Sequence, residues 1–77
     1  MPWIHAIFTD TAREKIAEHG ISEEEVREVL EEADVHTTSR SSGLPLAQGR
    51  TAAGRWLVVV YRELDPITWE VITAFEP

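Results

Sequence analysis

The stretch Arg55-Trp-Leu-Val-Val-Val-Tyr-Arg62 (residues 55–62, RWLVVVYR) decides the fold of this 77-residue chain. Its β-branched and aromatic residues are typical of a strand, and alternate side chains of a strand point to opposite faces of the sheet. Both faces are apolar, with one set made of Trp56, Val58 and Val60 and the other of Leu57, Val59 and Tyr61. A strand with one solvated face would instead alternate apolar with polar residues. The stretch therefore predicts a central strand with something against each face.

Further strands are predicted on both sides of this one. Residues 44–51 precede it across the turn Ala52-Ala53-Gly54, and residues 67–75 follow it across Asp65-Pro66. Because Pro45 cannot donate to a ladder and Gly49 weakens a strand, we expect residues 44–51 to be edge-like or bulged. The last strand is predicted to place its large apolar residues on a single face: Ile67, Trp69, Val71 and Phe75.

The first half of the chain predicts one strand and two helices, followed by another strand. Residues 3–8 (WIHAIF) have strand composition, and residues 35–40 form a strand that ends at the turn Ser41-Ser42-Gly43. Thr11 with Glu14 and Ser22 with Glu25 each match a capping box, which marks a helix start. Gly20 lies where the first helix is predicted to end. Apolar positions recur at helical spacing in both segments: Ala12, Ile16 and His19, then Val26, Val29, Leu30 and Ala33.

The predicted order β-α-α-β-β-β-β indicates an α+β fold in a single domain spanning residues 1–77. We expect the two N-terminal helices to pack on one face of a mainly antiparallel sheet. Two short helices cover only one face of such a sheet. The other face is therefore expected to be covered by another chain or used for binding.

Composition excludes several classes of site. The chain has no cysteine, so disulfides and thiolate metal sites are excluded. No histidine spacing matches a zinc motif, and no glycine pattern matches a phosphate or dinucleotide loop, so we predict neither a metal nor a cofactor. The longest apolar run, residues 56–61, is far shorter than the ~20 residues that span a bilayer. No basic segment precedes an apolar one at the N-terminus. We expect a small cytoplasmic protein with no membrane partner.

Charge is distributed unevenly along the chain. Residues 10–34 hold ten acidic and three basic side chains, residues 35–62 hold four arginines and no acid, and residues 63–77 hold four acids, which together give the net charge of −7. A local patch, rather than the total, decides which ligand a surface attracts. The basic window makes a nucleic acid one candidate ligand.

Three segments together resemble a known family. The run His19 to Leu30 (HGISEEEVREVL), the run Gly49 to Tyr61 (GRTAAGRWLVVVY) and the ending Val71 to Phe75 (VITAF) are similar to the BrnT-like branch of the RelE/ParE toxin superfamily and its short uncharacterised relatives. The resemblance covers residues 8–75. It implies a compact RelE-like fold, ribonuclease activity and a bacterial toxin–antitoxin setting. The sequence departs from the toxin pattern in its acidic total charge and in Phe75, where such a toxin would place an arginine.

Metal-independent RNA cleavage needs a base, a cation for the phosphorane charge and a proton donor. His36 is the candidate base, and the matches to the family motif make Arg50 and Arg55 the candidate phosphate-binding residues of a catalytic set. The alternative is an exposed edge-strand histidine and two arginines paired with nearby carboxylates. Around this set we predict RNA contacts from Arg40, Arg62 and Tyr61. Tyr61 would equally suit core packing, and an offset of seven residues directs Arg55 and Arg62 to opposite faces.

Two functional hypotheses follow from these features. The first is a RelE/BrnT-like toxin–antitoxin protein, either a metal-independent endoribonuclease that acts on RNA or the ribosome, or a relative that has lost the cutting activity. The second is a non-enzymatic interaction module. Both include a homodimer or an antitoxin-like partner bound through the sheet, because the acidic helices of two copies would repel each other.

Overall fold

A computed structural model of the chain describes residues 4–33, 35–40 and 42–77. Its elements are β1 (His5–Phe8), α1 (Asp10–Glu18), α2 (Glu23–Glu32), β2 (Val35–Thr38), β3 (Pro45–Arg50), β4 (Trp56–Asp65) and β5 (Thr68–Phe75). The predicted order of elements and the α+β class are confirmed. The predicted start of the first strand at Trp3 lies outside the described residues, as does Ser41 of the first predicted turn.

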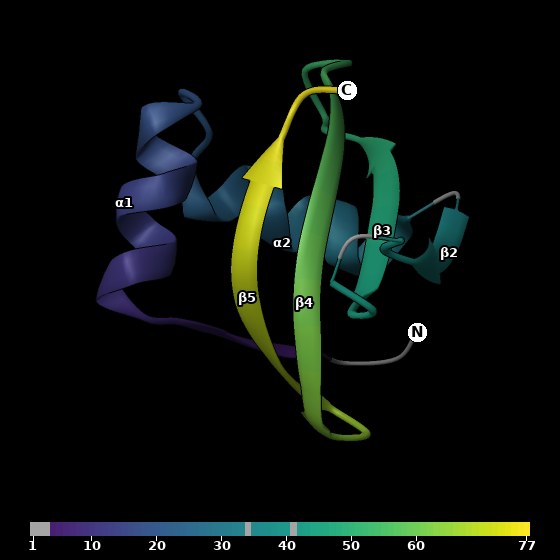
Figure 1. The fold of residues 1–77 in the computed structure, drawn as a ribbon. Helices are drawn as coiled ribbons and strands as arrows, with labels where there is room; N and C mark the ends of the chain where they lie inside the picture. The colour runs from purple at the N-terminus through teal and green to yellow at the C-terminus, as the bar shows by residue number, and fades with distance from the viewer. Residues whose placement is uncertain (1–3, 34, 41) are drawn as a thin grey trace.

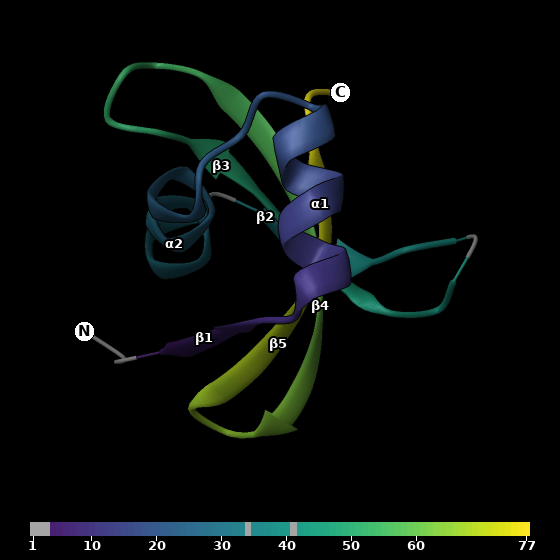
Figure 2. The ribbon, with the colours of Figure 1, turned by 90° about the vertical axis from the view of Figure 1, so that its left-hand side faces the viewer.

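The five strands form one mixed sheet in the order β1-β5-β4-β3-β2. β1 runs parallel to β5, and the other pairs are antiparallel. α1 contacts β5 and β1, whereas α2 contacts β3 and β4 (Figures 1 and 2). One core cluster holds Ile16 of α1, Val29 of α2 and Leu57 of β4. Both helices therefore cover the same face of the sheet, as predicted.

The first helix starts earlier than the sequence predicted. Thr9, rather than Thr11, is the N-cap, and its Oγ1 accepts a hydrogen bond of 3.1 Å from the amide of Ala12. Thr11 lies inside α1, so the predicted capping box with Glu14 is wrong. Thr9 competes successfully because its backbone is extended, which lets the hydroxyl reach back over the first turn.

The second helix starts where the sequence predicted. The Ser22 hydroxyl accepts from the Glu25 amide at 3.2 Å, and the Glu25 carboxylate accepts from the Ser22 amide at 3.0 Å. This reciprocal capping box satisfies two amides that the helix itself leaves without acceptors. The buried side chains of α2 form the predicted apolar stripe: Val26, Val29 and Leu30.

The expectation that residues 44–51 form an edge strand is wrong. β3 pairs with β4 on one side and with β2 on the other, so β2 is the edge of the sheet. Pro45 is accommodated because it is the first residue of β3 and lies opposite Thr38 at the end of β2. A proline at that position removes no interior ladder bond.

A bulge changes which side chains of β5 enter the core. The register shifts between Val60 and Tyr61, so that Thr73 pairs with Val60 whereas Val71 pairs with Tyr61. Beyond the shift, Ala74 pairs with Val59 and is fully buried on the helix side. Phe75 pairs with Val58 on the opposite side. The prediction that Val71 and Phe75 share a face is therefore wrong, because one extra residue reverses the alternation.

We call the sheet face that carries no helix the open face. The β3–β4 and β4–β5 pairings place on it Leu46, Gln48, Arg50, Trp56, Val58, Val60, Arg62, Glu70, Thr73 and Phe75. Val58 and Val60 are only 4% and 8% exposed within the single chain. The apolar surface that another chain would have to cover is thus smaller than the alternation in residues 55–62 suggested.

Among the described residues, no helix is both long enough and apolar enough to cross a membrane.

The two leucines of β4 give a test of the burial pattern. Leu57 is fully buried, whereas Leu64 is 53% exposed. Leu57→Ala should lower the free energy of unfolding by about 2–5 kcal/mol, because it removes packed methyl groups and leaves a cavity. Leu64→Ala should change it by less than ~0.5 kcal/mol. Urea unfolding measures both, and similar losses in the two variants would contradict the assigned core.

Candidate functional site

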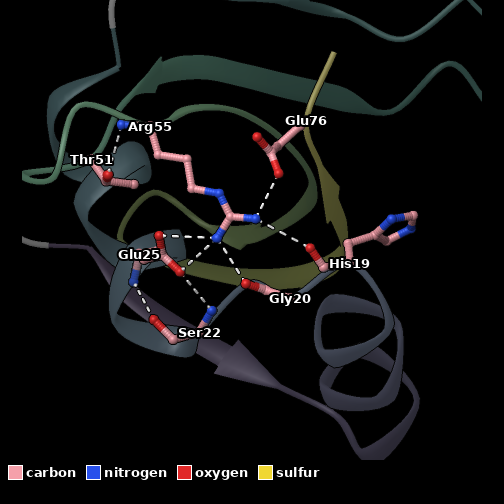
Figure 3. Close-up of polar contacts among 7 residues, drawn as sticks. All are labelled: His19, Gly20, Ser22, Glu25, Thr51, Arg55 and Glu76. Carbon is pink, nitrogen blue, oxygen red and sulfur yellow. Dashed lines mark hydrogen bonds and ion pairs between the residues drawn. The ribbon is translucent and has the colours of Figure 1, made fainter.

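The Arg55 side chain projects from the turn before β4 towards the junction between the two helices (Figure 3). Thr51 and Arg55 close this turn with two hydrogen bonds. The Thr51 amide donates to the Arg55 carbonyl at 2.9 Å, and the Thr51 hydroxyl accepts from the Arg55 amide at 3.2 Å. Gly54 takes a positive φ of 83° inside the turn, a conformation that favours glycine. The turn chemistry therefore fixes where the guanidinium points.

Both terminal nitrogens of Arg55 are bound. Nη1 donates to the Gly20 carbonyl at 2.7 Å and to the Glu25 carboxylate at 3.3 Å. Nη2 donates to the Glu76 carboxylate at 2.6 Å and to the His19 carbonyl at 3.3 Å (Figure 3). One side chain thus joins the end of α1, the start of α2 and the segment after β5. We call this set of contacts the Arg55 junction.

The Arg55 junction forms where helix ends provide acceptors. α1 ends at Glu18, and the chain then turns through Gly20, whose φ of 67° lies in the left-handed region. Carbonyls at the C-terminus of a helix lack helical partners and carry partial negative charge. A guanidinium satisfies several such acceptors at once because its five N–H groups lie in a rigid plane.

The carboxylates of the junction titrate below their usual range. The Ser22 amide, together with the charge and hydrogen bonds of Arg55, lowers the pKa of Glu25. A hydrogen bond from Arg55 lowers the pKa of Glu76, and the same contact raises the pKa of Arg55. Glu25 thus serves the capping box and the arginine together.

A neighbouring contact ties the same turn to α2. The Ala52 amide donates to Glu28 Oε2 at 2.7 Å. Glu28 comes from the acidic segment and Ala52 from the basic window, so the two oppositely charged parts of the sequence fold against each other.

Arg50 and Arg55 are not brought together. Arg50 pairs with Trp56 across the β3–β4 hairpin, which places both on the open face, with the guanidinium carbon 5.8 Å from the indole centroid. Arg55 lies next to Trp56 and is directed to the helix side. No carboxylate among the described residues forms an ion pair with Arg50.

The other two predicted RNA-binding arginines lie elsewhere. Arg62 shares the open face and forms a loose pair of 3.8 Å with Glu70, its partner across the β4–β5 hairpin. Six residues separate it from Trp56, so it lies roughly 20 Å along the strand from the Arg50–Trp56 pair. Arg40 is exposed in the turn between β2 and β3. Arg55 and Arg62 point to opposite faces of the sheet, as their offset of seven residues in the sequence predicted.

His36 and Tyr61 meet on the face of the sheet that the helices cover, whereas Arg50 lies on the open face. His36 Nδ1 lies 3.2 Å from the Tyr61 hydroxyl, and the Tyr61 ring stacks on Trp69 with centroids 4.4 Å apart. His36 also meets Trp69 edge-on at 6.2 Å. Burial, with Glu63 nearby, raises the pKa of Tyr61. Sequence reasoning named His36 and Tyr61 separately and missed Trp69 as their partner.

The indole of Trp69 adds one unusual feature to this aromatic cluster. Its Nε1 is buried and has no hydrogen-bond partner among the described residues. A buried donor without a partner costs free energy. In this cluster the packing of the aromatic rings is therefore maintained although one buried N–H group has no hydrogen bond.

The three predicted catalytic residues occupy three places in the fold: His36 in the aromatic cluster, Arg50 on the open face and Arg55 in the junction. The described residues contain no group of three or more side chains suited to hold a metal ion.

Comparison with known families gives one match. A model described as a domain of unknown function, DUF4258, matches residues 8–76. The chain belongs to the DUF4258 family. Searches of curated proteins and of solved structures found no match. The DUF4258 match spans α1 through β5 and includes every member of the Arg55 junction.

We predict that the Arg55 junction makes the stability of this DUF4258 domain depend on pH. Glu25 and Glu76 have lowered pKa values in the folded state. The stability that they contribute is therefore fully present above about pH 4.5 and is lost as the pH falls through their pKa values in the folded state. Arg55→Met should lower the urea midpoint of unfolding at pH 7. Between roughly pH 5 and pH 3 this midpoint should then decrease less steeply than that of the wild type.

Arg13→Met is the matched control for this prediction. Arg13 also pairs with two carboxylates, those of Asp10 and Glu23, but in an exposed position on α1. Exposed pairs contribute little, so its urea midpoint should stay near the wild-type value. Equal effects of the two substitutions would contradict a special role for Arg55.

Proposed function

We propose that this protein is a RelE/BrnT-like component of a bacterial toxin–antitoxin-type pair that works by binding a protein partner and has lost RNA-cutting activity. The observation that carries the proposal is that groups of the protein itself already bind the Arg55 guanidinium. The resemblance assigns this arginine to phosphate, yet both of its terminal nitrogens bind protein acceptors.

Phosphate would compete poorly for Arg55. A phosphate at Nη2 would have to displace the Glu76 carboxylate, which lies at 2.6 Å, and would then lie next to Glu25 on Nη1. The repulsion between phosphate and Glu25 opposes such binding, because like charges a few ångströms apart destabilise each other. A structural role for Arg55 therefore explains the motif without catalysis.

The position of Arg55 also offers a structural explanation for the sequence segments that carry the resemblance. Two of the three segments that carry the resemblance, residues 19–30 and the more particular residues 49–61, are the ones that Arg55 joins. The sheet order, with β1 parallel to β5 and two helices on one face, supports a RelE-like fold. These observations favour a shared architecture more strongly than a shared reaction.

The open face has the chemistry of a protein-binding surface. Its half-buried side chains include Leu46, Trp56 and Phe75, and Arg50 lies at its margin against Trp56. Tryptophan and arginine are the residue types most enriched among the residues that dominate binding energy. The partner segment that fits this surface presents apolar side chains and a carboxylate for Arg50, as an antitoxin-like protein could.

The His36–Tyr61 hydrogen bond favours a second candidate function, ribonuclease activity. A histidine held by a hydroxyl is oriented for proton transfer, and its exposed position leaves it open to RNA. In that alternative Arg40, in the following turn, would supply the cation.

Expression and cleavage assays distinguish the two functions. We expect no growth arrest on expression without a partner, and no cleavage of RNA by the purified protein, with or without ribosomes. Cleavage that is lost in His36→Ala and Tyr61→Phe would establish the ribonuclease and refute the binding role.

Partner binding tests the open face directly. Arg50→Ala should weaken binding to a protein encoded by an adjacent gene by about tenfold or more, as expected for an arginine anchor. Arg13→Ala, on α1, is the matched control and should bind as the wild type does. Calorimetry with the co-expressed partner measures both affinities. Unchanged affinity in Arg50→Ala would rule out the open face as the binding surface.

A further inference from the structure

β2 leaves one edge of the sheet uncovered. All four of its residues are exposed, and no described element lies beyond it at the right-hand side of Figure 1. Its sequence, Val-His-Thr-Thr, contains no carboxylate, lysine, arginine or proline. Such groups are among the means by which proteins prevent an edge strand from pairing with another chain, and the four-residue length of β2 is the one such feature that it retains.

The pairing of β2 with β3 shows which backbone groups are directed outward. Thr38 lies opposite Pro45, which has no N–H and therefore cannot exchange two hydrogen bonds with Thr38. The next pair, Ser39 with Leu44, is bonded by the Ser39 amide at 2.7 Å. Hydrogen-bonded and non-bonded pairs alternate in an antiparallel ladder. The backbone groups of His36 and Thr38 therefore point away from β3.

We infer that β2 pairs antiparallel with β2 of a second copy about a two-fold axis at Thr37. In this register His36 faces the partner's Thr38, and Thr38 faces the partner's His36. Each of these two pairs exchanges two hydrogen bonds, which gives four in all. Registers centred on His36 or on Thr38 leave only one such pair within the strand and so give two. The register centred on Thr37 thus uses every outward backbone group of β2.

Charge favours this edge over other surfaces for self-association. The chain carries a net charge of −7, and the exposed glutamates of α2 include Glu24, Glu31 and Glu32. α2 packs mainly over β3 and β4. In the inferred dimer the β3 strands of the two copies lie three strand spacings apart, roughly 14 Å. That separation exceeds the ~8 Å screening length at physiological salt, so the acidic helices repel weakly.

The other edge of the sheet is less suited to pairing. The side chains of β1 are more buried, and Phe8 at its end is in the core, with the Arg27 guanidinium 5.2 Å from the centre of its ring. The dimer inferred here is independent of the proposed function, because the open face remains free in it. The small contact area indicates weak, reversible association.

Disulfide trapping tests the register. The chain has no cysteine, so Thr37→Cys introduces the single thiol of each copy. At the two-fold axis the Cα atoms of a non-bonded pair lie about 4.5 Å apart, within disulfide range. Thr37→Cys should form a covalent dimer under mild oxidation at least tenfold faster than Thr11→Cys, a control on exposed α1. Equal rates in the two variants would overturn the register.

Two further variants test the edge itself by analytical ultracentrifugation. Thr38→Pro removes an outward N–H that the monomer does not use, and Thr37→Lys places two positive charges together at the axis. Both should abolish a wild-type dimer that strengthens as salt is raised. A wild-type dimer that survives both substitutions would indicate an interface on the open face and refute this proposal. A wild type that stays monomeric at millimolar concentration and 0.5 M salt would also refute it.

Discussion

One guanidinium, from the turn before β4, connects the junction of the two helices at residues 19–25 with the segment after β5, which lies far away in the sequence. Arg55 bonds to carbonyls at the end of α1, to the capping glutamate of α2 and to Glu76 after β5. A domain of 77 residues buries a thin core, so contacts that fix the angle between its elements matter more than in a larger protein. The helix junction, the turn before β4 and the end of the last strand all depend on this contact.

The uneven charge of the sequence has a structural explanation in these contacts. The basic window folds back on its acidic flanks through Arg55 with Glu25 and Glu76, and through Arg62 with Glu70. The backbone of the same window donates to Glu28. Two of the four arginines in the basic stretch that suggested a nucleic-acid ligand, Arg55 and Arg62, thus pair with acidic residues within the fold. Among the described residues, Arg50 remains on the open face with an aromatic contact and no ion pair.

Local signals in the sequence predicted the helices and the order of elements, because capping boxes and apolar periodicity depend on neighbouring residues. They missed the Thr9 cap, the interior position of β3 and the bulge that moves Phe75 to the open face. The cap is local, but two threonines competed for it, whereas the position of β3 and the bulge depend on pairing between distant segments. The same limit applied to the site. The sequence offered Arg55 as either a phosphate ligand or a partner of carboxylates, and only the meeting of the helix ends with the turn favours the second.

Nitrogen-detected NMR of the arginine side chains tests the central claim about Arg55 most directly. With both Nη groups bound to protein acceptors, rotation about the Cζ–Nε bond should be slow, and separate Nη signals should persist at neutral pH and in 50 mM phosphate. Arg50, which is exposed, should give averaged signals that shift with phosphate. Averaged Arg55 signals that move on phosphate addition would contradict the structural role and return this arginine to the candidate catalytic set.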